Sequence, residues 1–226
     1  MNKKIQKKWL TAGILFLLFL LLILLVKTAD VAAIGPKGTS IGLSHLNKAF
    51  RDAVGVQVFW YILTEIIGIL ALILAGLFAV AGIFQWIRRK SLFRVDREIL
   101  CLGGLYAVVL LTYAFFEKVI VNYRPVMMTG ETDPEASFPS SHTVLIIAIL
   151  GSLIMVLNKY VSEKKPRRIL RMVFFFVMVI TVLGRLLSGV HWLTDILGAI
   201  LIGSSYLMAF SAVLDRVLPS RRHRKE

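Results

Sequence analysis

Six long runs of apolar residues constrain this chain more than any other feature of its sequence. A helix needs about 20 apolar residues to cross the hydrocarbon core of a bilayer. The runs lie at about residues 9–26, 66–87, 99–116, 143–157, 169–187 and 192–214. Because lipid offers no hydrogen-bond partner to an open strand edge, each run is expected to be helical. The sequence therefore predicts an all-α fold, an integral membrane bundle of six transmembrane helices that forms a single domain over residues 1–226.

The basic residues indicate how this bundle is oriented. Twenty of the 27 Lys and Arg residues lie before the first run, between the second and third, between the fourth run and the first turn of the fifth, which contains Arg171, and after the sixth. The other seven are Lys27, Lys37, Lys48, Arg51, Lys118, Arg124 and Arg185. Because cytoplasmic loops carry the excess of Lys and Arg, both termini are predicted to be cytoplasmic. We therefore interpret the net charge of +14 as a topology signal and a contact with anionic lipid, not as a nucleic-acid footprint.

The segment around the first run allows two interpretations. Residues 31–33 resemble the cleavage site of a signal peptide, but the apolar run before them is longer than the about 7–15 residues typical of a signal. We favour an uncleaved helix. Beyond it, a short helix capped by Ser44 and containing Leu46, Phe50 and Val54 is expected at the outer surface, as a connector packed on the bundle.

Three polar clusters adjoin the predicted outer ends of the spans. They contain Lys118 and Arg124 after the third run, Ser140, Ser141 and His142 before the fourth, and Arg185, His191 and Asp195 between the last two. The spans and the charge bias place all three clusters on one face of the membrane, without reference to the clusters themselves.

The chemistry of these residues suits a phosphate ester. Arg124 and Arg185 offer planar guanidinium groups that match phosphate oxygens. The serine pair at a helix start offers hydroxyl and free N–H groups at a positive dipole end, next to His142. His191 and Asp195 are four residues apart, so on a helix they would share a face, and the carboxylate would leave one ring nitrogen free to attack. The other histidine would then protonate the departing oxygen.

Each of these residues taken alone has a simpler interpretation. An Arg near a span end usually extends to the lipid headgroups, a His in a loop is usually solvated or structural, and a serine pair before an apolar run is usually a helix cap. Two His, two Arg, one Lys and one Asp on one face together favour a site.

The three clusters resemble the signature of the type-2 phosphatidic acid phosphatase superfamily, membrane lipid phosphatases related to vanadium haloperoxidases. That signature is Lys-x6-Arg-Pro, Pro-Ser-Gly-His and Ser-Arg-x5-His-x3-Asp, and the resemblance extends from Lys118 to Asp195. It implies that His191 is transiently phosphorylated, that Asp195 orients it and that His142 is the general acid. The phosphate oxygens would be held by Arg124, Arg185, Ser140 and Lys118, with the backbone N–H of Ser141 also facing the phosphate. The resemblance implies no cofactor and no metal, and the single cysteine, Cys101, excludes a metal site built from several thiolates.

The chain departs from this signature at three places. Ser141 replaces the motif glycine, and Gly184 replaces the serine before Arg185. Only five residues separate Lys118 from Arg124, so Glu117 occupies the family lysine position. One residue on a helix is about 100° of rotation. Either the flexible Lys118 side chain reaches round, or a local bulge restores the register, or the lysine role is lost.

Several acidic residues lie near the clusters. Glu65, close to the outer end of the second span, is an intramembrane ionisable group and therefore a functional candidate, with a salt bridge to an outer Arg or Lys as the equal alternative. Glu131, Asp133 and Glu135 are interpreted as a solvated loop that tunes substrate choice or product release.

The sequence thus predicts a membrane lipid phosphatase that acts at the outer face on a lipid phosphate or diphosphate. Undecaprenyl diphosphate is the first expected substrate and phosphatidylglycerophosphate the second. The alternatives are a non-enzymatic phospholipid carrier or scramblase, and a lipid phosphotransferase. No nucleic-acid partner is expected, and the sequence does not define the oligomeric state.

Overall fold

The computed structural model describes residues 2–127, 130 and 132–218. The described chain is helical, without strands, and its helices are connected by short turns and one longer loop. The helices are α1 (Lys3–Thr28), α2 (Ser44–Val54), α3 (Val58–Arg89), α4 (Arg97–Lys118), α5 (Ser141–Tyr160), α6 (Lys164–Leu187) and α7 (Leu193–Val217), with short 3-10 turns at Pro36–Gly38 and Leu92–Arg94. All of these except α2 and the two 3-10 turns are long and apolar enough to cross a membrane, which confirms the predicted fold class.

The spans are longer than the apolar runs that predicted them. The largest difference is in α3, whose 32 residues begin eight positions before the predicted start at residue 66. At 1.5 Å per residue it is about 48 Å long, more than a bilayer core requires. The additional turns at its N-terminus carry Trp60, Tyr61 and Glu65, which interrupt the apolar pattern but do not break the helix.

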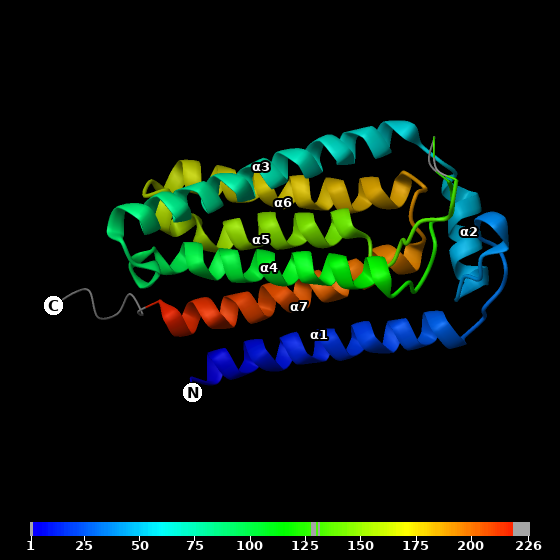
Figure 1. Cartoon of the computed structure of the whole chain (residues 1–226), viewed down its shortest axis with the longest axis horizontal. Coiled ribbons are helices and arrows are strands. Elements are labelled where there is room, and N and C mark those ends of the chain that lie inside the picture. The colour runs from blue at the N-terminus through cyan, green and yellow to red at the C-terminus, as the bar shows by residue number, and fades with distance from the viewer. Residues whose placement is uncertain (1, 128–129, 131, 219–226) are drawn as a thin grey trace.

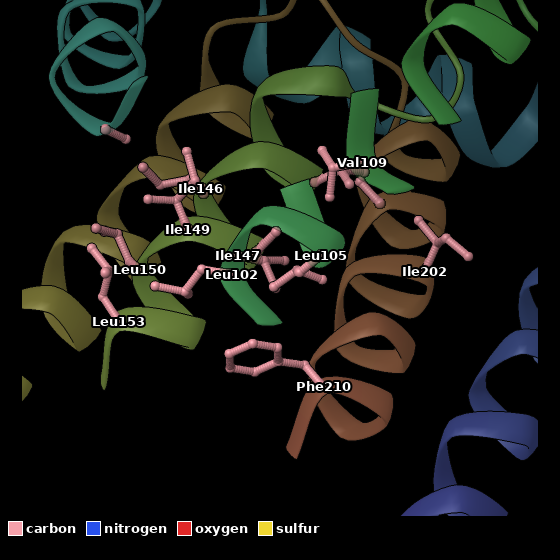
Figure 2. Packing of buried hydrophobic residues seen from close by; sticks show 14 of the residues in the cluster. Leu102, Leu105, Val109, Ile146, Ile147, Ile149, Leu150, Leu153, Ile202 and Phe210 are labelled. Atoms are coloured by element: carbon pink, nitrogen blue, oxygen red, sulfur yellow. The ribbon is translucent and has the colours of Figure 1, made fainter. Parts of the chain in front are cut away.

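Helix α5 forms the centre of the bundle (Figure 1). It packs against α3, α4, α6 and α7, while α1 lies along α7 on the other side. Two thirds of its most apolar window is buried, against 11% for α3. The fourth run is the shortest in the sequence, and α5 nevertheless has 20 residues. Figure 2 shows Ile146, Ile147, Ile149, Leu150 and Leu153 of α5 within this core.

Helices α4 and α7 supply most of the remaining core residues around α5. Figure 2 shows Leu102, Leu105 and Val109 of α4, and Ile202 and Phe210 of α7. The outer helices instead expose leucine, isoleucine and phenylalanine side chains over their outward faces. This distribution is expected where lipid rather than water surrounds the bundle.

The two ends of the bundle differ in what they carry. At one end, Asp215 pairs with Lys4 at 3.1 Å and with Lys8 at 2.8 Å, which joins the start of α1 to the end of α7. Most of the basic residues assigned to the cytoplasm lie at this end; Arg221, Arg222, Arg224 and Lys225 lie outside the described residues. At the other end, α4 and α6 finish, α3, α5 and α7 begin, and α2 lies across them. The three polar clusters therefore share one end, as predicted.

The short helix between the first two spans forms, but its cap differs from the prediction. Leu43, with a left-handed φ of 48°, takes the capping position, and Ser44 is the first helical residue. The free N-terminal groups are satisfied by Asp30, which accepts the Ser44 hydroxyl at 2.9 Å and the His45 backbone N–H at 2.8 Å. Asn47 then joins α2 to α7, because its amide bonds both the hydroxyl and the backbone N–H of Thr194.

Candidate active site

The histidine and aspartate of the third cluster meet at the start of α7. Trp192 is the capping residue, and Asp195 Oδ2 accepts its backbone N–H at 2.9 Å. His191 immediately precedes this cap, and its Nδ1 lies 3.7 Å from the same oxygen. The expectation that His191 and Asp195 share a helix face is wrong, because α7 begins at Leu193, after the histidine. Their proximity comes from the reciprocal cap instead.

Two further contacts fix the Asp195 carboxylate and its surroundings. Asp195 is fully buried, and its Oδ1 accepts from Asn122 Nδ2 at 3.4 Å. Its backbone carbonyl accepts the N–H of Ser140 at 3.2 Å, which ties the start of α5 to the start of α7. The second and third clusters are thus joined through the backbone.

Arg185 is the central cation of the site. It lies in the last turn of α6, fully buried, with its guanidinium 5.4 Å from the Tyr61 ring centre. Its Nη2 donates to His191 Nε2 at 3.2 Å, and its Nη1 donates to Glu65 Oε1 at 2.8 Å. Because a guanidinium only donates, His191 Nε2 must carry a lone pair here, with the ring proton on Nδ1 facing Asp195.

Glu65 connects Arg185 to the other histidine. While Oε1 accepts from Arg185, Oε2 lies 3.1 Å from His142 Nε2. The salt bridge expected as one of the two interpretations is present, and its arginine is itself a predicted site residue. The sequence did not identify the partner because spacing within α3 does not say which helices pack beside it.

The serine pair begins α5 as expected, and its two members differ. Ser140 is the capping residue, fully buried, and its hydroxyl accepts from Thr143 at 3.1 Å. Ser141 is the first helical residue and is half-buried, with His142 next to it. The N–H of Ser140 is already bound to Asp195, so the backbone groups that remain for an anion are those of the first helical turn.

Arg124 reaches the site on the loop between α4 and α5. An isolated antiparallel bridge between Tyr123 and Ala136 holds this loop together, and Trp192 Nε1 donates to the Tyr123 carbonyl at 2.7 Å. Arg124 Nε lies 3.3 Å from Glu135 Oε2. Glu135 is exposed, as expected for a solvated loop, and it is also the carboxylate beside a predicted phosphate ligand.

The other acidic residues of this loop lie apart from the site or cannot be placed. Asp133 pairs with Lys37 at 3.0 Å, and both side chains are exposed. Glu131 lies outside the described residues.

Lys118 is the last residue of α4 and is exposed. Within the described chain it makes no hydrogen bond or ion pair with a member of the site. The structure does not bring Lys118 to the two histidines, and its role in phosphate binding stays a prediction.

The electrostatics favour a neutral His191 ring. Burial lowers the pKa of His191 well below its usual 6.5, and the positive charges of Arg185, Arg124 and His142 lower it further. These charges act on one ring, which indicates that the three clusters converge. Among the described residues, Arg185 Nε is buried without a hydrogen-bond partner, while Arg124 Nε is ion-paired with Glu135. A buried donor left unpaired costs about 1–3 kcal/mol, so Arg185 Nε suits an incoming anion.

Sequence reasoning missed the residues that support the site from α2, α3 and the α4–α5 loop. Tyr61 and Thr64 contact Arg185, and Asn122 contacts Asp195. The available signal was on α3, where Tyr61, Thr64 and Glu65 share a face at spacings of three and four residues.

The fold and the site together define a helical membrane protein with a cluster of arginine, histidine and carboxylate side chains at one end of its bundle. The sequence profile of the PAP2 superfamily matches residues 98–218, more than half of the chain, and the chain belongs to this superfamily. Its structure is similar to the crystal structure of the first transmembrane PAP2 type phosphatidylglycerolphosphate phosphatase from Bacillus subtilis. The TM-score is 0.66 at 20% identity, over 94% of this chain and 99% of that one. The search of curated proteins found no match.

Proposed function

We propose that this protein is a metal-independent lipid phosphatase that removes a terminal phosphate from a lipid phosphate or diphosphate at the outer membrane face. The observation that best supports the proposal is the 3.2 Å contact between Arg185 Nη2 and His191 Nε2, a cation beside the lone pair of a ring nitrogen. The superfamily and the fold of the Bacillus subtilis phosphatase support the reaction class.

In the first step, His191 Nε2 attacks phosphorus and the bond from phosphorus to the lipid oxygen breaks. Arg185 releases His191 Nε2, Arg124 releases Glu135, and the two guanidinium groups bind the non-bridging oxygens. His142 gives a proton to the departing lipid oxygen, so the lipid alcohol or lipid monophosphate leaves neutralised. Asp195 stabilises the positive charge that develops on the His191 ring.

In the second step, water hydrolyses the phosphohistidine. His142, now neutral, takes a proton from the attacking water, the bond from phosphorus to Nε2 breaks, and orthophosphate leaves. Both histidines return to their starting states, so no metal or cofactor is needed for the balance.

The substrate keeps its tail among the helices and presents its phosphate at the polar end of the bundle. Undecaprenyl diphosphate is our first candidate. Phosphatidylglycerophosphate is the second, and the activity named for the Bacillus subtilis protein supports including it. The charge asymmetry of the two ends supports an outward site, with both termini in the cytoplasm.

Orthophosphate release by the purified protein tests the proposal, with both lipids and phosphatidate as substrates. His191→Ala should reduce release at least about a thousandfold, and His142→Ala by about 100- to 10,000-fold. His45→Ala, whose side chain is 94% exposed on α2, is the matched control and should retain activity. Unchanged release by His191→Ala would sink the mechanism.

The same assay separates the rival functions. Saturable headgroup binding without any release of phosphate indicates a carrier or scramblase. Appearance of the phosphate on a second lipid rather than in water indicates a phosphotransferase.

A further inference from the structure

One face of α3 contacts the site along two turns, although none of the three clusters lies on this helix. Tyr61, Thr64, Glu65 and Gly68 are spaced as i, i+3, i+4 and i+7, which places them on one side of a helix. Tyr61 lies under the Arg185 guanidinium, and Thr64 Oγ1 accepts from Arg185 Nη1 at 3.4 Å. Glu65 contacts both Arg185 and His142.

Gly68 gives the His142 ring its place against α3. A Cβ atom at this glycine would lie 2.9 Å from His142 Cδ2 and 3.3 Å from Nε2. Any larger residue would push the ring away from the helix, since real Cβ contacts at such distances are essentially absent. Glu65 and Gly68 therefore form two sides of one seat for the imidazole.

Gly184 has the corresponding function between α3 and α6. A Cβ atom there would lie 2.7 Å from Thr64 Cγ2 and 3.0 Å from Trp60 Cε3. This glycine stands where the family signature has serine, and it allows the two helices to approach closely enough for Glu65 to reach Arg185 at 2.8 Å. The departure from the signature and the Glu65 contact thus belong to the same arrangement.

We propose that Glu65 is a positioning residue, whose single carboxylate fixes the general acid His142 with one oxygen and the phosphate-binding Arg185 with the other. This inference rests on the proposed phosphatase reaction. An ionised carboxylate only accepts hydrogen bonds, so it requires His142 Nε2 to carry a proton. Nε2 is then occupied, and Nδ1 is the nitrogen that gives a proton to the leaving oxygen and later takes one from water.

The charged and titratable groups around Glu65 come from several elements. Arg185 from α6 and His142 from α5 contact it directly, and Tyr61 lies on its own helix. His191 contacts Arg185, and the positive charge of Arg124 acts on both histidines. Among the described residues, Glu65 is the carboxylate that bridges two predicted site residues, and Asp195 serves the other histidine.

The test uses the dependence on the leaving group. An alkyl lipid phosphate needs a proton on its leaving oxygen, whereas p-nitrophenyl phosphate has a leaving group stable without one. Glu65→Gln should lower kcat for the lipid phosphate about 10- to 100-fold, and kcat for p-nitrophenyl phosphate by less than about threefold. The reason is that the glutamine amide nitrogen donates a hydrogen bond to His142 Nε2, so this ring nitrogen can no longer carry a proton. KM should change little, since the amide oxygen still accepts from Arg185.

Two comparisons accompany this variant. Asp52→Asn, on the exposed side of α2, should leave both substrates unaffected. Gly68→Ala displaces the His142 ring without removing a charge and should give the same selective loss, which keeps the test available if Glu65→Gln does not fold.

The outcomes separate the two proposals. If Glu65→Gln loses activity equally on both substrates, or on neither, the positioning role of Glu65 is overturned. The proposed function still stands in that case, provided that the wild type is active and that His142→Ala loses more activity on the lipid phosphate than on p-nitrophenyl phosphate. A wild-type protein that releases phosphate from neither substrate overturns the proposed function and the positioning role with it.

Discussion

At the scale of single residues, two carboxylates serve the two imidazoles differently. Asp195 is fully buried and bound by backbone and amide N–H groups, so it cannot leave its histidine. Glu65 is a third exposed and shares its charge between Arg185 and His142. The first arrangement suits a group that stabilises a developing charge, and the second suits a group that holds a proton donor ready.

The protonation of His191 gives a direct prediction at this scale. Its lowered pKa means that the neutral, nucleophilic ring persists to a lower pH than for an ordinary histidine. In protein carrying isotope-labelled histidine, the His191 resonance should remain that of a neutral ring as the pH falls from about 8 to about 6. Its loss in His191→Gln assigns the signal. A midpoint at or above the ordinary value of 6.5 would contradict the electrostatics of the site.

The sequence identified these residues better than it identified their geometry. Spacing correctly associated His191 with Asp195, but a shared helix face was the wrong reason, since the pair is joined by a helix cap. Glu65 could be flagged as an ionisable group in a span, but its partners lie 77 and 120 residues away. Contacts between helices at such separations depend on packing, which one sequence does not encode in any local pattern.

At the scale of elements, the contact between α3 and α6 controls the position of Arg185. The residue before Arg185 is Gly184, and the space for its missing side chain is filled by Thr64 and Trp60 of α3. Among the spans, α3 is therefore more than a lipid-facing wall, although only 11% of its most apolar window is buried.

Restoring the family serine should consequently harm this protein. Gly184→Ser should lower the free energy of unfolding in detergent by about 1–3 kcal/mol, because the new side chain overlaps α3. Turnover should fall as Glu65 moves from Arg185. Gly76→Ser on α3 meets open space and should change stability by less than about 0.5 kcal/mol. If Gly184→Ser has the same stability and the same turnover as wild type, the close approach of α3 and α6 does not contribute to function.

The existence of the membrane-spanning helices could be predicted from the sequence, but the residues at which they begin and end could be predicted less well. Apolar runs located all six spans, because lipid demands long uninterrupted hydrophobic stretches. The helices extend further because basic residues such as Arg88 and Arg167 continue them into the headgroup region, where charge is tolerated. The apolar stretch around α3 extends over residues 56–87, but the span was predicted from residue 66 because Glu65 interrupts the pattern. In the structure the charge of Glu65 is balanced by Arg185 from another helix.

At the scale of the whole molecule, the bundle has one end that holds the site and one that holds most of the basic residues. This polarity predicts the topology of the protein in a cell. In a Cys101→Ala background, Lys37→Cys, exposed at the end of the bundle that holds the site, should react with an impermeant thiol reagent in intact cells. Lys90→Cys, at the other end of α3, should react only after permeabilisation. The reverse pattern would place the site in the cytoplasm and contradict the proposed orientation.

The most direct measurement on the central claim is the site of phosphorylation during turnover. A reaction with lipid phosphate, quenched in alkali where phosphohistidine survives, can be digested and analysed by mass spectrometry. The account predicts one phosphoryl group on His191, absent from His191→Ala and from enzyme without substrate. A phosphoryl group on any other residue, or none in an enzyme that is turning over, would contradict it.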